Sequence, residues 1–159
     1  MSKIVTNLIL ILTLTLLSGC ANLQTKKVSN TFGITILSPI MRINDVGFLH
    51  KNNDSLNLQI YSSAVNIANI KINDRICINN VCYEKKEFNR QFFLNEHYDE
   101  FFAEILERKP IYDRRNLVAN PCGFSQNLSN YSIQYEVCDS NINFVDTKNG
   151  IKIIIKELE

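Results

Sequence analysis

The side chains best suited to covalent chemistry in this sequence are its five cysteines. A cysteine thiolate can act as a nucleophile, bind a metal, form a disulfide or carry an acyl group. A catalytic cysteine or serine usually needs a histidine as its base, and the chain has only His50 and His97. His97, Tyr98 and Asp99 are consecutive, so their side chains diverge and form no triad. No metalloprotease, nucleophile-elbow or phosphate-loop motif occurs. We therefore predict a protein that is not an enzyme, with no catalytic residues, metal site or cofactor.

The first cysteine, Cys20, follows a short apolar segment at the start of the chain. Lys3 supplies a positive charge, and residues 8–17 are apolar apart from two threonines. A membrane-spanning helix needs about 20 apolar residues, and this run is much shorter. The segment is therefore typical of an export signal.

The L-S-G-C ending at 17–20 resembles the lipobox of bacterial lipoproteins. The resemblance implies diacylation of Cys20 with chains such as palmitate, cleavage before it and acylation of the new amino terminus. An ordinary signal peptide with a chance cysteine is the alternative. Ala21 after the cysteine, in place of Asp, resembles the preference for sorting to the outer membrane. The predicted parts are a lipoprotein signal peptide (1–19), the lipidated cysteine with a tether (20–31) and one globular domain facing the periplasm (32–159).

The other four cysteines point to disulfides, because an even number remains in an exported chain. Four cysteines allow three pairings. In C-I-N-N-V-C at 77–82, the two asparagines favour a two-residue hairpin turn that places Cys77 opposite Cys82. Cys122 would then pair with Cys138. A zinc site made of all four cysteines is the rival, but the close C-x2-C spacing of zinc knuckles is missing.

Charge and length limit the classes of partner. Without residues 1–19 the chain keeps 140 residues, enough for one domain with a substantial core. Its basic and acidic side chains then balance at 16 each, because the signal contains one of the 17 basic residues. A neutral chain has no net charge that would attract nucleic acid or anionic lipid, so we predict no nucleic-acid partner.

Alternation of apolar and polar residues predicts strands through most of the domain. Residues 110–122 are predicted to form a loop between two prolines. The predicted strands lie at 32–37, 40–49, 56–61, 65–72, 77–82 (a hairpin), 123–126, 131–137, 142–145 and 151–155.

Two helices are predicted in the middle of the chain. The first spans 85–93, and the second places Tyr98, Phe101, Phe102 and Ile105 on one face before Pro110 ends it. Such an aromatic stripe is usually core, but it can also border a ligand cavity. The candidate cavity lining combines this stripe with residues of the later strands: Tyr98, Phe101, Phe102, Ile105, Ile133, Tyr135, Phe144 and Ile153.

The order of elements and the final strands resemble the outer-membrane lipoprotein receptor LolB and its relatives. The most similar stretches are G-F-S-Q at 123–126, Y-S-I-Q-Y-E at 131–136 and N-G-I-K-I-I-I-K at 149–156. The resemblance implies an incomplete antiparallel barrel that is closed by helices around an apolar cavity for acyl chains. One departure is the membrane-touching loop, where the family has a prominent leucine and this chain has S-S-A-V at 62–65. Small lipoproteins of Gram-negative bacteria are also similar as a class.

We therefore expect an α+β domain in which a curved antiparallel sheet, an incomplete barrel, has a helical pair covering one face. The expected function is that of a membrane-anchored lipoprotein of the bacterial envelope that binds acyl chains or other lipoproteins in a LolB-like cavity. The alternative is a non-enzymatic structural or accessory lipoprotein whose core is solid.

Overall fold

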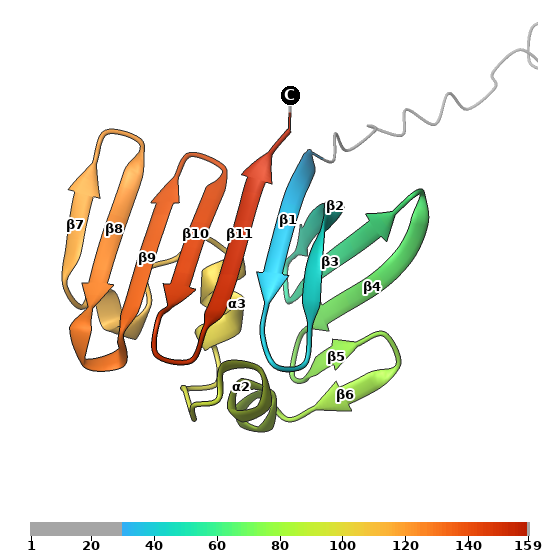
Figure 1. Ribbon diagram of the computed structural model, residues 1–159, viewed down its shortest axis with the longest axis horizontal. Coiled ribbons are helices and arrows are strands. Elements are labelled where there is room, and N and C mark those ends of the chain that lie inside the picture. Colours follow the sequence, from blue (N-terminus) through green and yellow to red (C-terminus); the bar gives the residue numbers. More distant parts are fainter. Residues whose placement is uncertain (1–29, 159) are drawn as a thin grey trace, which may run out of the picture.

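The computed structural model describes residues 30–158 of the chain. The predicted signal segment and Cys20 lie outside these residues. The described part forms eleven strands and two α-helices (Figure 1). The elements in chain order are β1 (Thr31–Leu37), β2 (Arg42–Asn52), β3 (Ser55–Ser62), β4 (Val65–Ile72), β5 (Ile76–Ile78), β6 (Val81–Tyr83), α2 (Lys85–Phe93), α3 (Phe101–Leu106), β7 (Leu117–Asn120), β8 (Gly123–Leu128), β9 (Ile133–Cys138), β10 (Asn141–Asp146) and β11 (Ile151–Glu157).

All eleven strands belong to one open antiparallel sheet, in the order β6-β5-β4-β3-β2-β1-β11-β10-β9-β8-β7. Strands β1 to β6 form one meander, and β7 to β11 form a second. The two meanders meet where the first strand pairs with the last, with Ile34 opposite Ile155 and Ile36 opposite Ile153. The sheet is not closed into a barrel, since β6 and β7 lie at its two ends.

The core lies on one face of this sheet because apolar side chains alternate with polar ones along the strands. Ile34, Ile36, Ile153 and Ile155 are each at most 1% exposed. Burial of one such side chain contributes about 1.5–3 kcal/mol relative to its exposure. We call this apolar side of the sheet the inner face and the opposite side the outer face.

In Figure 1, α3 lies behind β10 and β11, and α2 lies at the lower end of the sheet. The aromatic side chains of both helices belong to the core on the inner face. Phe93 of α2 contacts Phe144 of β10, with ring centroids 5.8 Å apart. The hydroxyl of Tyr135 in β9 donates to the Ile105 carbonyl oxygen of α3 over 3.3 Å. The covering helices are short, so the described domain is mostly β, one open antiparallel sheet with two short helices, rather than α+β as predicted.

Three details of the predicted elements need correction. Strand β9 begins at Ile133, because Tyr131 belongs to the short 3-10 helix η2 (Ser129–Tyr131). Helix α3 begins at Phe101, so Tyr98 precedes the helix instead of lying on it. Residues 117–120, predicted as loop, form the edge strand β7, which pairs only with β8. The L-V-A-N sequence of β7 has no clear alternation, because an edge strand with two exposed residues needs no apolar face.

The cysteines form two disulfides, Cys77–Cys82 and Cys122–Cys138, and these are the predicted partners. Cys77 lies directly opposite Cys82 in the β5–β6 hairpin, where Asn79 has the positive φ of 54° expected at the turn. Cys122, between β7 and β8, is bonded to the end of β9. Each bridge therefore lies near one free edge of the sheet.

The contact of β1 with β2 depends on a glycine. Ile34 of β1 occupies the space beside Gly47, where a Cβ would lie 2.5 Å from the Ile34 Cδ1 and would also overlap the Gln59 carbonyl oxygen. We predict that Gly47→Ala lowers the free energy of unfolding by about 1–3 kcal/mol through overpacking. Gly33→Ala is the matched control, because the nearest atom to its added methyl is the Leu158 Cδ2 at 3.5 Å. Urea denaturation measures both variants, and equal stabilities would contradict the packing described.

Candidate functional site

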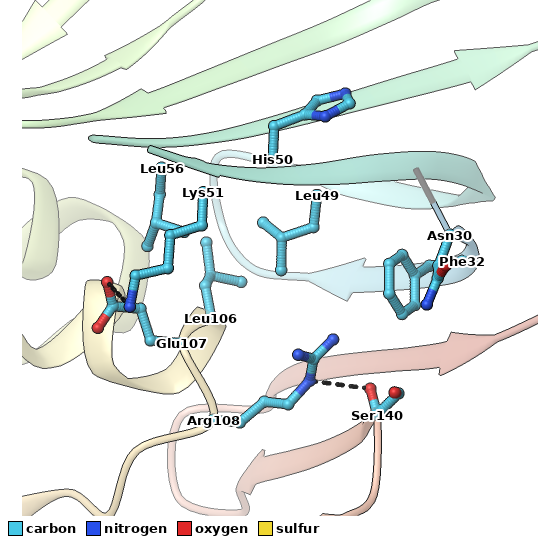
Figure 2. A pocket seen from close by; sticks show the side chains of 10 residues that line it. All are labelled: Asn30, Phe32, Leu49, His50, Lys51, Leu56, Leu106, Glu107, Arg108 and Ser140. Carbon is cyan, nitrogen blue, oxygen red and sulfur yellow. Dashed lines mark hydrogen bonds and ion pairs between the residues drawn. The ribbon is translucent and has the colours of Figure 1, made fainter. Parts of the chain in front are cut away.

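A groove opens at the end of α3, between that helix and strands β1 to β3 (Figure 2). Its volume is about 270 Å³. The apolar side chains that line it come from three strands and the helix, and their order along the chain is Phe32, Leu49, Leu56 and Leu106. Phe32, Leu56 and Leu106 are almost fully buried, so the floor of the groove is part of the core. The groove is therefore a small concave apolar surface at one end of the core.

Charged side chains surround this floor. The Arg108 guanidinium lies over the Phe32 ring, 5.5 Å from its centroid, and its Nε donates to the Ser140 carbonyl oxygen over 3.0 Å. Such a cation–π contact and a backbone acceptor together hold the guanidinium at the rim. Figure 2 also shows that His50, although it borders the groove, points away from the apolar side chains.

Glu107 carries the negative charge at the groove. Its carboxylate is 3.1 Å from the Lys51 Nζ and also pairs with Lys109. Burial alone would raise the pKa of Glu107, but hydrogen bonds from the two lysines hold that pKa below its usual range. Glu107 is therefore ionised at neutral pH. The rim then combines the cations of Lys51 and Arg108, the Glu107 carboxylate and an apolar floor, a combination that suits an amphiphilic ligand.

The predicted cavity lining is found elsewhere, inside the core. Seven of the eight side chains are at most 1% exposed, and Tyr98 is half-buried. The structure does bring them together: Phe101 contacts Phe144 with centroids 5.9 Å apart, and Tyr135 contacts the same ring at 6.1 Å. None of the eight lines the groove. The seven buried ones are Phe101, Phe102, Ile105, Ile133, Tyr135, Phe144 and Ile153.

Sequence reasoning missed the groove because its residues are far apart in the chain and have no shared motif. Phe32 and Leu56 were recognised only as strand residues. The one useful signal in the sequence is Arg108, a basic residue shortly before Pro110 at the end of the second predicted helix.

A buried polar cluster lies beside the aromatic core. His97 is 3% exposed and stacks on Phe101 with centroids 3.8 Å apart. Its Nδ1 is 2.6 Å from the Tyr112 hydroxyl, while its Nε2 is buried without a hydrogen-bond partner. Burial lowers the pKa of His97 to about 4, against the opposing effect of the Asp146 carboxylate. The imidazole is therefore neutral at pH 7 and serves as a core side chain.

The loop after α3 is held by a buried amide. Gln126, 2% exposed, accepts from the Ile111 N–H over 2.8 Å and donates to the carbonyl oxygens of Ile111 and Arg115 at 2.9 and 2.7 Å. Between these points Tyr112, Asp113 and Arg114 all have positive φ, a conformation that non-glycine residues rarely adopt. The amide of Gln126 therefore fixes a strained turn at the surface.

The described residues contain no cluster of histidine, cysteine, aspartate or glutamate side chains able to hold a metal ion. Within residues 30–158 no helix is long and apolar enough to cross a membrane. Comparison of the chain with protein-family models, with curated proteins and with solved structures finds no match.

The buried histidine predicts an acid sensitivity. In the unfolded chain His97 titrates near 6.5, whereas in the folded protein its pKa is about 4. Its neutral form thus stabilises the fold fully above pH 6.5, and this contribution is lost as the pH falls towards 4. We expect His97→Phe to flatten the dependence of unfolding free energy on pH in this window. Urea denaturation at several pH values tests this, and an unchanged slope in the variant would assign the acid sensitivity to another group.

Proposed function

We propose that the protein is a non-enzymatic lipoprotein, anchored to the bacterial envelope through Cys20, whose domain is a solid scaffold for contacts at its surface. The observation that carries the solid-scaffold interpretation is the complete burial of the side chains that were expected to line a cavity. Phe101, Phe102 and Phe144 are each 0% exposed and lie within a continuous set of ring contacts. An acyl chain inside the domain would have to displace these rings.

The proposed location at the periplasmic side of the outer membrane rests on the lipobox resemblance and on Ala21. The two disulfides add weak support, because such bonds persist in oxidising compartments. Neither disulfide carries any information about a ligand.

A second candidate function is the binding of one acyl chain or lipidated protein at the groove beside α3. The observation that favours it is the apolar floor under the Arg108 guanidinium, which would suit a ligand with an apolar chain and an anionic head. The groove volume of about 270 Å³ lies just below the 300–1,000 Å³ of most small-molecule pockets. The groove would accommodate part of a chain rather than enclose it.

The anchor is tested by replacing its cysteine. We expect Cys20→Ala to abolish lipidation and to leave an unprocessed or soluble protein, because stable membrane attachment needs at least two acyl chains. Membrane fractionation and the mass of the mature protein report the result. Normal processing and membrane recovery of the variant would refute the lipobox interpretation.

The solid core is tested by enlarging a buried side chain. Ile133 is 1% exposed, and we expect Ile133→Trp to lower the free energy of unfolding by about 1–3 kcal/mol because the core has no spare space. The parent protein should also bind a fluorescent acyl probe weakly or not at all. A stable Ile133→Trp protein that loses tight probe binding would instead establish an internal cavity.

Binding of a ligand at the groove is tested with a further variant in the same probe assay. Arg108→Gln should weaken any binding at the groove, since it removes the cation while keeping a polar side chain of moderate length. Arg114→Gln is the matched control, because Arg114 is an exposed arginine of the following loop and does not line the groove. Binding that is unaffected by Arg108→Gln would place the probe elsewhere.

A further inference from the structure

The outer face of strands β4, β3, β2, β1 and β11 has an unbalanced charge, although the mature chain is neutral. The register places four cations on this face: Arg42 opposite Leu37, Lys71 opposite Asn57, and Lys152 and Lys156 opposite Leu37 and Gly33. All four cations are exposed. By the same register, no carboxylate of these five described strands lies on the outer face.

The centre of this face is apolar and aromatic. Phe48 of β2 contacts Tyr61 of β3 edge to face, with ring centroids 5.7 Å apart. Val46 is opposite Tyr61 and 44% exposed, and nearby Ile67 in β4 is 40% exposed. Leu158, directly after β11, lies beside Gly33 of β1 and is 45% exposed. Exposed apolar side chains that cluster in this way commonly mark a contact surface.

The place where the chain enters the sheet indicates what this face contacts. The sheet begins at Thr31, whose direct partner in β2 is Phe48, and the Leu158 N–H donates to the Thr31 carbonyl oxygen over 2.8 Å. Ten residues separate Cys20 from Thr31. Even fully extended, ten residues span at most about 36 Å. If Cys20 carries the lipid anchor, the aromatic centre lies beside the residue at which the tether enters the described domain.

We propose that the outer face of β4, β3, β2, β1 and β11 docks on a lipid bilayer that contains anionic phospholipids. Phe48 and Tyr61 meet the interfacial region, where aromatic side chains are favoured. Arg42, Lys71, Lys152 and Lys156 contact the phosphate groups. This inference rests on the proposed anchoring through Cys20 and adds an orientation: the groove and the helices then lie on the side away from the membrane.

The absence of tryptophan from the chain makes a direct test possible. The full mature lipoprotein with Phe48→Trp is reconstituted into phosphatidylcholine vesicles, with or without phosphatidylglycerol, that contain brominated lipid as a quencher. We expect strong quenching of the single tryptophan in the vesicles with phosphatidylglycerol. The control is Val81→Trp on the edge strand β6, where the side chain is 55% exposed. Val81 is opposite Ile78, which is in turn opposite the buried Ile70, so it lies on the inner face and should not be quenched.

A charge variant in the Phe48→Trp background tests the role of the cations. Each lysine near an anionic surface is worth about a fivefold change in the ratio of docked to undocked domain, so Lys152→Gln with Lys156→Gln should lower that ratio about 25-fold. Lys86→Gln, an exposed change on α2, should leave the quenching unaltered.

The outcomes separate the two hypotheses. A protein that does not float with vesicles would refute the anchor, and the docking would be refuted with it. A protein that floats but shows no quenching of Phe48→Trp, or equal quenching of Val81→Trp, would refute the docking alone. A blue shift of the Phe48→Trp emission that rises with protein concentration in detergent would assign this face to a second copy of the chain and would also refute the docking.

Discussion

The pairing of β1 with β11 is the constraint on which the described domain depends. It joins two meanders that would otherwise each present a row of unpaired backbone groups at the centre of the sheet. The same pairing aligns Ile34 and Ile36 with Ile155 and Ile153, so the two meanders share one apolar face. The aromatic side chains of α2 and α3 cover this shared face. Without the central pair, neither meander would bury enough surface to hold the helices.

The packing of the inner face limits where function is located. Rings from both helices and from β9 and β10 fill the space that a curved sheet with a helical cover could otherwise leave open. What remains is a small groove at the end of α3 and the outer surface of the sheet. The groove offers an apolar floor with an arginine beside it, and the outer surface offers cations around two aromatic rings. Both lie where contacts can form without disturbing the core.

Local patterns predicted most of the strands, the helix at 85–93, the turn at Asn79 and both cysteine pairs, because periodicity and turn chemistry act over a few residues. Sequence did not reveal β7, whose residues lack alternation, or the late start of α3 after Tyr98. The groove could not be predicted from the sequence for a different reason. Its floor combines Phe32, Leu56 and Leu106, and only the β1–β2–β3 register and the position of α3 bring them together. Likewise, the even charge balance of the composition gave no sign of the four cations on the outer face of β4, β3, β2, β1 and β11.

The two free edges have a consequence for the behaviour of the protein at high concentration. An open sheet exposes unpaired N–H and C=O groups at its ends, and such groups can recruit strands of other molecules. Here the edge strands are short, three residues in β6 and four in β7. A disulfide next to each edge holds the outermost strands on the sheet. Loss of those strands would expose a longer strand to pairing with other molecules. Oxidation of the cysteines therefore protects the protein from aggregation as well as from unfolding, and reducing conditions should favour fibrous or amorphous association over a soluble unfolded chain.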